Sequence, residues 1–394
     1  MGNPLLPRLL RCPKRSFFLF GPRGTGKSTW LRQALPAAPR LDLLDAALYL
    51  ELSRDPHRLE AIVGNRPAGD WVVLDEIQKV PALLDEVHRL IEDRRWRFAL
   101  CGSSARKLRR GGANLLAGRA LTLQMEGFCQ PELGSLFELD RAIRFGTLPF
   151  VVDQADDAAE ILAAYVTTYL KEEILAEGLI RQAPPFIRFL GIAGLLNGQV
   201  VNGQNVARDA GVARSTVDTY FSILIDTLVG HFLPAWRPGL KVREAAHPKW
   251  YWFDPGVARG VAGLLRDPVD RVWEGTALET LLYHELRVYN EISRLHRPIS
   301  YYRSPAGVEI DFVVEIAPRR SGASPRLVAI EVKRAEKWNR AWEKPMRSLA
   351  ALSGARVERM IGVYTGPRPY RFDSVEVMPV AAFLDALHRG TIFG

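Results

Sequence analysis

The chain has 394 residues, 47% of them hydrophobic, and a formal net charge of +9 at pH 7. Its length is sufficient for two or three domains with substantial cores, and its ordinary composition excludes a disordered or fibrous protein. Cys12, Cys101 and Cys129 have no paired spacing and indicate neither a disulfide framework nor a zinc site. No apolar run has the length of a membrane span, so we expect a cytoplasmic protein without a membrane partner. The positive charge favours a polyanionic partner such as DNA.

Residues 17–29 form the most informative stretch of the chain. An apolar run precedes a glycine-rich loop that fits G-x-x-x-x-G-K-[ST], and a helical pattern follows it. Such a loop turns its backbone N–H groups toward phosphates, and the next helix directs its positive end to the same place. We therefore expect ATP to bind at Gly21, Pro22, Arg23, Gly24, Thr25, Gly26, Lys27, Ser28 and Thr29. Lys27 is expected at the β- and γ-phosphates, and the Ser28 hydroxyl on Mg²⁺.

Two acids follow the next strongly apolar run, at residues 71–74. A run that is apolar at every position is typical of a parallel strand buried on both faces, and ligands bind at the carboxyl ends of such strands. We expect Asp75 to hold Mg²⁺ and Glu76 to polarise the attacking water. The alternative is a pair of acids that begins an ordinary turn.

The strand predicted at residues 97–101 ends in Gly102, Ser103 and Ser104. Ser103 is placed to orient the water as a sensor, or else to cap a turn. Arg119 precedes another apolar stretch and is predicted to stabilise transition-state charge, on its own nucleotide or on that of a neighbouring subunit. The alternative for Arg119 is a structural role. Between Ser103 and Arg119 lies a basic cluster of Arg106, Lys107, Arg109 and Arg110. This cluster is either a solvated face or a contact with DNA phosphates.

The phosphate loop, the acid-tipped strand and the polar-tipped strand together resemble an AAA+ ATPase. The segments 102–104, 116–119 and 146–149 resemble a widespread prokaryotic family of AAA+ ATPases. The carboxy-terminal region of that family was long catalogued as a domain of unknown function. The resemblance covers nearly the whole chain and implies ATP hydrolysis with Mg²⁺.

Residues 204–220 resemble a helix-turn-helix, with Gly211 at the end of the first helix. In a DNA-binding protein of this kind, contact with a groove or with phosphates would come from Arg214, Ser215, Thr216 and Thr219. A winged-helix unit of this size can also serve as a packing module or as a lid over the nucleotide. A long helix is expected at residues 158–180, ending before Pro184 and Pro185.

Asp311, followed by Glu331-x-Lys333 on the next strand, resembles the core of a PD-(D/E)xK nuclease. Glu279, on the preceding helix, is its additional acid. Since residues two apart on a strand share a face, Glu331 and Lys333 should point the same way. Asp311 and Glu331 are expected as Mg²⁺ ligands, and Lys333 as the group that positions water or steadies the phosphate. No proline precedes Asp311, which departs from the usual pattern, and an ordinary strand pair with surface charges is the alternative.

We therefore predict an α/β chain of three domains. Residues 1–150 should form an AAA+ P-loop ATPase domain, residues 151–238 a helical, winged-helix-like domain, and residues 239–394 a small mixed α/β PD-(D/E)xK nuclease-like domain. The predicted function is ATP-dependent DNA processing with Mg²⁺-dependent cleavage, on DNA that is branched or otherwise structured. The alternatives are a nucleotide-switched DNA-binding protein that does not cut and a regulator of protein partners. Assembly into a homo-oligomer is expected, with a hexamer as one candidate size.

Overall fold

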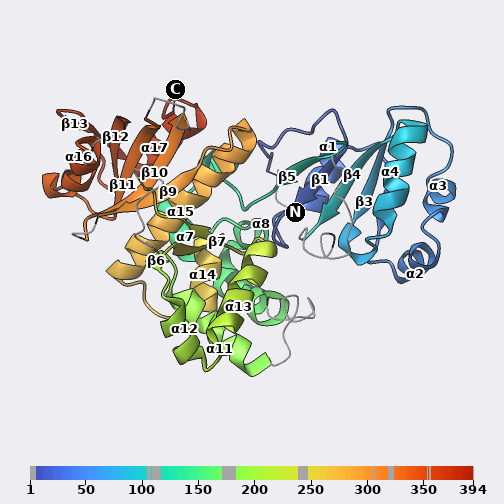
Figure 1. Ribbon diagram of the computed structural model, residues 1–394, viewed down its shortest axis with the longest axis horizontal. Helices are drawn as coiled ribbons and strands as arrows, with labels where there is room; N and C mark the ends of the chain where they lie inside the picture. The colour runs from blue at the N-terminus through green and yellow to red at the C-terminus, as the bar shows by residue number, and fades with distance from the viewer. Residues whose placement is uncertain are drawn as a thin grey trace.

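The computed structural model describes residues 6–103, 108, 116, 118–170, 183–237, 247–304, 307–317, 324–352, 354 and 356–393. The basic cluster expected between Arg106 and Arg110 lies outside these residues. Figure 1 shows one sheet with its helices at each end of an elongated molecule, and a mostly helical part between them. The long helix α15 (Arg271–Ser293) runs beside the second sheet and extends toward the first.

The first sheet has five strands in the order β2-β3-β4-β1-β5, and every neighbouring pair is parallel. The parallel α/β sheet predicted from the sequence is thus confirmed. Side chains alternate along β1, so Phe18 and Phe20 enter the core on one face, and Phe17 and Leu19 the core on the other. The elements are β1 (Phe17–Phe20), α1 (Lys27–Ala34), β2 (Arg40–Asp42), α2 (Ala46–Arg54), α3 (Arg58–Val63), β3 (Trp71–Asp75), η1 (Ile77–Lys79), α4 (Leu83–Arg94), β4 (Arg97–Gly102) and β5 (Leu121–Gln124).

The strand order determines which loops meet. Strand β4 lies between β3 and β1, so three carboxyl ends are adjacent at one edge of the sheet. The phosphate loop follows β1, the two acids lie at the end of β3, and Ser103 follows β4. Ligands bind outside this edge in open parallel sheets.

The middle of the chain is mostly helical. The helix expected at 158–180 begins as α9 (Ala158–Ala164) and continues as a π-helical segment (Tyr165–Leu170), while residues 171–182 lie outside the described part. Pro184 and Pro185 lie in the first turn of α11 (Ala183–Leu195), where a missing N–H costs little. The other helices are α6 (Gln130–Leu133), η2 (Gly134–Leu136), α7 (Leu139–Phe145), α8 (Pro149–Asp153), η3 (Ala155–Asp157) and α14 (Pro255–Val261).

The predicted helix-turn-helix segment contains two helices, α12 (Gly203–Ala210) and α13 (Arg214–Asp226). Gly211 between them has a positive φ of 68°, as a glycine that ends a helix commonly does. A small antiparallel sheet of β6 (Gln199–Val200), β8 (Lys249–Trp252) and β7 (Gly230–Leu233) lies with them. Strand β8 therefore pairs with the middle part of the chain, although the sequence assigned residues from 239 onward to the third domain. The three domain boundaries stay a prediction.

The last part of the chain contains a six-stranded mixed sheet in the order β13-β14-β12-β11-β10-β9. Strand β9 pairs antiparallel with β10, and β10 pairs antiparallel with β11. The remaining strands, β12 to β14, had no counterpart in the sequence analysis. The elements are β9 (Ile299–Arg303), β10 (Glu309–Ala317), β11 (Arg326–Lys333), η5 (Arg340–Glu343), α16 (Lys344–Ala350), β12 (Arg356–Tyr364), β13 (Tyr370–Phe372), β14 (Val375–Pro379) and α17 (Val380–His388).

Helix α15 connects these parts. One continuous core contains buried residues of the middle helices, α15 and the last sheet. Toward its carboxyl end, α15 binds the segment that leaves β5: Glu291 Oε1 accepts from Gln124 N at 2.8 Å, and Arg287 pairs with Glu126. No helix among the described residues is long and apolar enough to span a membrane.

Candidate functional site

The phosphate loop joins β1 to α1. Gly24 and Gly26 have φ values of 81° and 85°, a conformation that glycine adopts without strain. A Cβ on Gly21 would lie 2.1 Å from the carbonyl oxygen of Met125, so no side chain fits there. Helix α1 begins at Lys27 without a capping side chain, which leaves its first N–H groups available to an anion.

Lys27 lies over this loop. It is only 8% exposed, and its ammonium group donates to the carbonyl oxygens of Gly21 at 2.8 Å and Pro22 at 2.9 Å. Carbonyl oxygens of the loop therefore hold the ammonium group in place. Phosphate oxygens could replace them as hydrogen-bond acceptors.

Ser28 and Asp75 meet at the carboxyl edge of the sheet. The Ser28 hydroxyl, at the start of α1, donates to Asp75 Oδ2, at the end of β3, at 2.6 Å. A hydroxyl and a carboxylate oxygen are ligands that Mg²⁺ accepts. The structure thus brings together the two side chains that were predicted to hold this ion.

Glu76 and Ser103 are linked through a residue that the sequence analysis missed. Gln78 is 6% exposed, and its Nε2 donates to Glu76 Oε2 and, at 3.3 Å, to Ser103 Oγ. Glu76 has a φ of 57°, in the left-handed region that few non-glycine residues occupy, and such strain is common at functional sites. A Cβ on Gly102 would lie 2.2 Å from Gln78 Oε1, so this glycine makes room for the amide.

Arg119 lies at the opposite edge of the sheet. It precedes β5, and Leu121 N bonds the carbonyl oxygen of Ser16, just before β1. Arg119 Nε lies 2.5 Å from Glu92 Oε1 near the end of α4. The phosphate loop follows β1 at the other edge, about 13 Å away along this four-residue strand. The role of Arg119, on its own nucleotide or on that of a neighbour, stays a prediction.

A pocket opens beside the start of α1. Arg8 crosses its edge, with its guanidinium 4.7 Å from the centre of the Phe128 ring and an N–H donated to the carbonyl oxygen of Glu126 at 2.7 Å. The Tyr165 hydroxyl donates to the carbonyl oxygen of Arg23 in the loop at 3.1 Å. Apolar and polar side chains from three parts of the chain line the pocket: Leu6, Arg8, Thr25, Gly26, Thr29, Trp30, Gln33, Phe128, Pro149 and Asp153.

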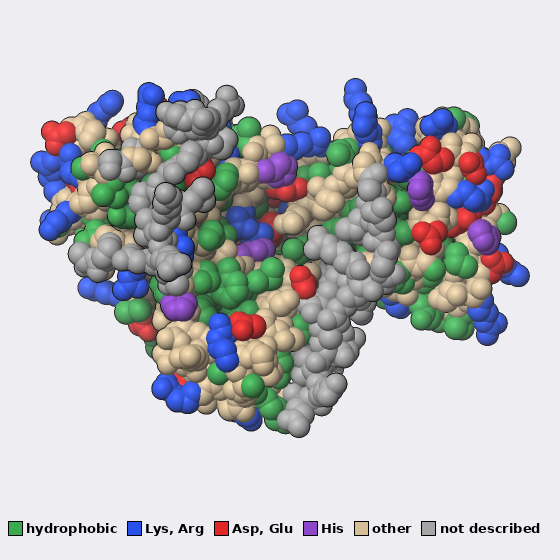
Figure 2. Space-filling view, viewed as in Figure 1, with side chains coloured by type: hydrophobic (Ala, Val, Ile, Leu, Met, Phe, Trp, Pro, Cys, Tyr) green, Lys and Arg blue, Asp and Glu red, His purple; other side chains and the backbone are tan. Residues whose placement is uncertain are grey.

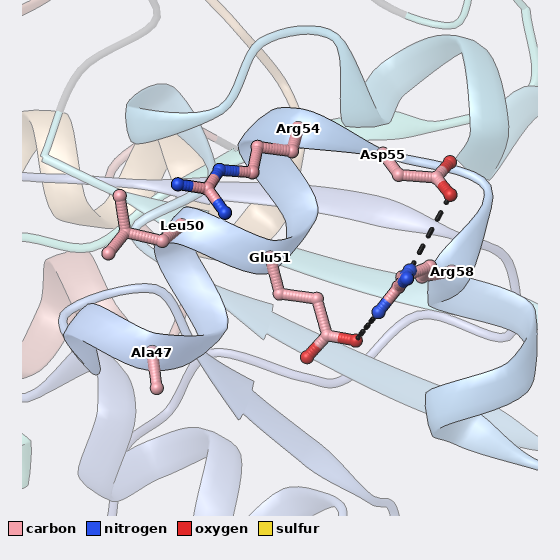
Figure 3. Close-up of a pocket in the computed structure, with 6 residues that line it drawn as sticks. All are labelled: Ala47, Leu50, Glu51, Arg54, Asp55 and Arg58. Carbon is pink, nitrogen blue, oxygen red and sulfur yellow. Dashed lines mark hydrogen bonds and ion pairs between the residues drawn. The ribbon is translucent and has the colours of Figure 1, made fainter.

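A second hollow lies on α2 and the start of α3 (Figure 3). It is lined by Ala47, Leu50, Glu51, Arg54, Asp55 and Arg58. Arg58 pairs with Glu51 at 2.9 Å and with Asp55 at 3.6 Å, so charges of this hollow neutralise one another. We assign no function to it.

The nuclease-like residues of the last sheet converge. Lys333 Nζ lies 2.6 Å from Glu331 Oε1 and 3.7 Å from Asp311 Oδ2. Asp311 Oδ2 also accepts from the backbone N–H of Val332 at 2.8 Å. Glu279, on α15, accepts from the Tyr251 hydroxyl at 3.0 Å. We call this group, with Glu309 and Lys249 described next, the carboxylate–lysine centre.

Lys249 is the second residue that the sequence analysis missed. It comes from β8, is 4% exposed, and its ammonium group lies 2.5 Å from Glu309, 3.7 Å from Glu279 and 4.0 Å from Asp311. A lysine in an otherwise aromatic strand, Lys-Trp-Tyr-Trp, was the available signal, because a buried lysine needs a carboxylate partner.

Burial controls the protonation of this centre. Desolvation, and then the charge of Asp311, raises the pKa of Glu279 to about 7 and that of Glu331 to about 8. Burial alone would lower the pKa of Lys249 and Lys333, but the surrounding carboxylates raise both above the ordinary lysine value. Glu331 Oε2 is buried and has no hydrogen-bond partner among the described residues. The centre holds four carboxylates and two lysines, and the raised pKa values of Glu279 and Glu331 mean that bound protons offset part of its negative charge.

The helix pair α12–α13 presents its predicted DNA-contacting residues outward. Arg214, Ser215 and Thr219 are exposed, and Thr216 is half-buried. Arg214 pairs with Asp218 one turn along α13. The positive charge of Arg214 is therefore balanced by an acid on the same helix.

The parallel sheet, its phosphate loop and the acid-tipped β3 lie in a segment that matches a known domain model. Residues 13–134 match the model of an AAA domain (AAA_14), residues 136–267 match a domain of unknown function (DUF8612), and residues 274–383 match another (DUF4143). The AAA and DUF4143 matches together support an AAA-type ATPase family for this chain.

Two mycobacterial proteins, both called uncharacterized, are similar over most of their length. One from Mycobacterium bovis and one from Mycobacterium tuberculosis are each 29% identical over 379 residues, covering 93% of this chain and 80% of theirs.

Two solved structures are more distantly similar. The Aeropyrum pernix ORC1 protein in complex with DNA has 14% identity and a TM-score of 0.31 over 64% of this chain and 86% of its own. A STAND protein with a tetratricopeptide repeat sensor from Pyrococcus horikoshii has 10% identity and a TM-score of 0.19 over 72% of this chain and 46% of its own. These TM-scores are too low to bear on function.

Proposed function

We propose that the first sheet binds and hydrolyses ATP. One contact carries this proposal, the hydrogen bond between Ser28 and Asp75, because it joins a phosphate-loop hydroxyl to a strand-end carboxylate. Those two side chains would hold Mg²⁺, which neutralises phosphate charge when bound. Lys27 would bind the β- and γ-phosphates, and Glu76, held by Gln78, would orient the attacking water.

We propose that the base of the nucleotide lies at the pocket beside α1. It adjoins Gly26 and Thr29, and its Phe128 ring and Pro149 offer apolar surface to a flat ring. Tyr165 and Phe150 bring the middle helices into contact with the phosphate loop, since a Cβ on Gly24 would lie 2.3 Å from the Phe150 ring. Nucleotide binding would therefore be communicated to the middle of the chain.

For the carboxylate–lysine centre we propose Mg²⁺-dependent cleavage of a DNA phosphodiester. The convergence of Asp311, Glu331 and Lys333 supports it, as does the buried Glu331 Oε2, which has no hydrogen-bond partner in the described part of the chain. Asp311 and Glu331 would hold the ion, with Glu279 as the further acid. Lys333 would position the water or steady charge on the phosphate.

One observation favours a second candidate, a nucleotide-switched DNA-binding protein that does not cut. Lys249 already supplies positive charge to Glu279, Glu309 and Asp311, where a catalytic ion would otherwise do so. A centre that is neutralised by its own lysine could serve as a buried structural network.

DNA is the proposed partner of both candidates. The net charge of +9 favours a polyanion. Figure 2 shows Lys and Arg side chains along the upper edge and at both ends of one face of the molecule. We propose further that the chain forms a homo-oligomer in which Arg119 acts on the nucleotide of a neighbour, with a hexamer among the candidate sizes.

Incubation of the protein with labelled branched and linear DNA, with and without ATP and Mg²⁺, separates the two candidates. Cleavage that needs Mg²⁺ and disappears in Asp311→Asn, while ATP hydrolysis persists, supports the nuclease. Lys333→Ala should cut on the order of a hundredfold more slowly and still bind DNA. DNA binding without any cleavage supports the switch.

A further inference from the structure

A third group of chemically active side chains shares no residue with either centre. Cys129 precedes α6, Glu285 lies in the middle of α15, and His388 is the last residue of α17. Their ligating atoms, one sulfur, one oxygen and one nitrogen, all lie within 4.8 Å of one another. Within the described ranges, no other group of three or more His, Cys, Asp or Glu side chains is this compact.

We propose that Cys129, Glu285 and His388 bind a zinc ion. Thiolate sulfur, imidazole nitrogen and carboxylate oxygen are the protein ligands of zinc, and a harder ion such as Mg²⁺ would not favour the sulfur. The charges also balance, because a thiolate and a carboxylate neutralise the two positive charges of the ion while the imidazole stays neutral. Binding would release to solvent the proton of the thiol and the one that Glu285 and His388 share.

The spacing of the three atoms suits such an ion. His388 Nε2 lies 2.6 Å from Glu285 Oε2. Zinc bonds its nitrogen and oxygen ligands at about 2.0–2.2 Å and sulfur at about 2.3 Å, which puts tetrahedral ligand atoms roughly 3.3–3.8 Å apart. The observed separations, 2.6 Å at the shortest named contact and 4.8 Å at most, bracket that range. Shifts on the order of 1 Å would complete the site.

Neighbouring groups already hold the proposed ligands. The backbone N–H of Gln130 donates to Glu285 Oε1 at 2.8 Å, which leaves Oε2 to face His388. The Gln130 side chain donates to Asp385, one turn before His388 on α17, at 3.2 Å. The ring of Tyr289 contacts the imidazole edge to face, with centroids 6.2 Å apart. Such outer contacts orient the ligands of metal sites.

Burial gives the ion a structural role. Cys129 and Glu285 are fully buried, and the His388 side chain is 8% exposed. The three ligands come from the segment after β5, from α15 and from the carboxy-terminal helix. One ion would therefore join the end of the ATPase sheet to the last part of the chain. The spacing of the cysteines did not indicate a zinc site, because only the fold brings these ligands together.

Metal analysis of the full-length chain tests the proposal. After dialysis with zinc and removal of the excess, we expect about one ion per chain. Cobalt substitution should produce thiolate-to-metal absorption in the near ultraviolet. Cys129→Ser should lose that absorption, and both Cys129→Ser and His388→Gln should lose at least about tenfold in zinc affinity. Cys12→Ser is the matched control, because it removes a thiol outside the group, and it should bind like the wild type.

The His388→Gln variant separates loss of a ligand from loss of the fold. Its amide can still donate to Glu285, so its circular dichroism should match the wild type while zinc binding falls. A wild-type chain that retains no zinc and shows no cobalt–thiolate absorption would overturn the proposal. Zinc binding by Cys129→Ser and His388→Gln that is as strong as that of the wild type would also overturn it. The group would then be a buried thiol beside a Glu–His hydrogen bond. None of these outcomes depends on ATP hydrolysis or DNA cleavage.

Discussion

The ammonium group of Lys249 lies 2.5 Å from Glu309 Oε1, although the two residues belong to different sheets. Lys249 is on β8 of the three-stranded sheet, and Glu309 begins β10 of the six-stranded sheet. The same ammonium group also faces Glu279 and Asp311. The middle part of the chain therefore contributes directly to the carboxylate–lysine centre.

Replacing this lysine should destabilise the fold and open the centre to cations. Lys249→Met leaves the buried Asp311 and the partly buried Glu279 and Glu309 without this counter-charge, for which we expect a loss of up to about 3–5 kcal/mol at neutral pH in urea unfolding. Added Mn²⁺ should restore part of the stability of Lys249→Met. Calorimetry should show that Mn²⁺ binds this variant more tightly than it binds the wild type. Lys337→Met, an exposed position beyond β11, is the control and should do neither. A variant as stable as the wild type, with no affinity for Mn²⁺, would show that Lys249 does not occupy the place of an ion.

The sequence predicted the parts of the proposed ATP site that are contiguous in the chain. The loop around Lys27 and the strand before Asp75 each contain their own pattern, so local reasoning was sufficient to place them. Glu331 and Lys333 could also be predicted from a local pattern, because side chains two residues apart on a strand lie on the same face of the sheet.

What the sequence did not reveal depends on packing between distant segments. Gln78 acquires its role because the backbone turns at Glu76 and brings its amide to Ser103. Lys249 acquires its role because β8 lies against α15 and β10. Glu285 and His388 are 103 residues apart and belong to no recognisable spacing. No local pattern contains these relationships.

Stability should depend on pH through Glu331 and Glu279. Burial raises the pKa of these carboxyls to about 8 and about 7, above their ordinary value of 4.5. The folded chain thus holds protons that the unfolded chain releases, so their contribution to stability is complete below about pH 4.5 and is lost as the pH rises toward 8. We expect the urea midpoint of the wild type to fall between pH 5 and pH 8, and that of Glu331→Gln to fall less.

Glu336→Gln is the control for this comparison, because Glu336 is exposed. Its pH dependence should match the wild type. An unchanged pH dependence in Glu331→Gln would mean that this carboxyl is ionised throughout the range.

We predict that Arg119 acts on the nucleotide of a neighbouring chain. The ATPase rate per chain should rise with protein concentration, and Arg119→Ala should lower the rate on the order of a thousandfold while ATP still binds. Glu92→Gln removes the observed ion pair but keeps the arginine, so it should hydrolyse ATP at close to the wild-type rate. A concentration-independent rate in a monomeric protein would leave Arg119 with a structural role.

DNA binding should be strongly dependent on salt. If α13 contacts DNA, Arg214→Ala should lower the slope of log affinity against log salt by about one. Asp218→Asn, which removes the acid paired with Arg214, should raise the affinity. Fluorescence anisotropy with labelled duplex and branched DNA measures both. Affinity that does not depend on salt, or no affinity for any form of DNA, would favour a regulator of protein partners.

The most direct test of the ATPase assignment measures ATP binding and ATP turnover on the same preparations. Lys27→Ala should lose tight ATP binding, because it removes the charge expected at the phosphates. Glu76→Gln should bind ATP normally and lose turnover, because it keeps the shape of the side chain but removes the carboxylate. Wild-type turnover in Glu76→Gln, or undiminished ATP binding in Lys27→Ala, would contradict the account of this site.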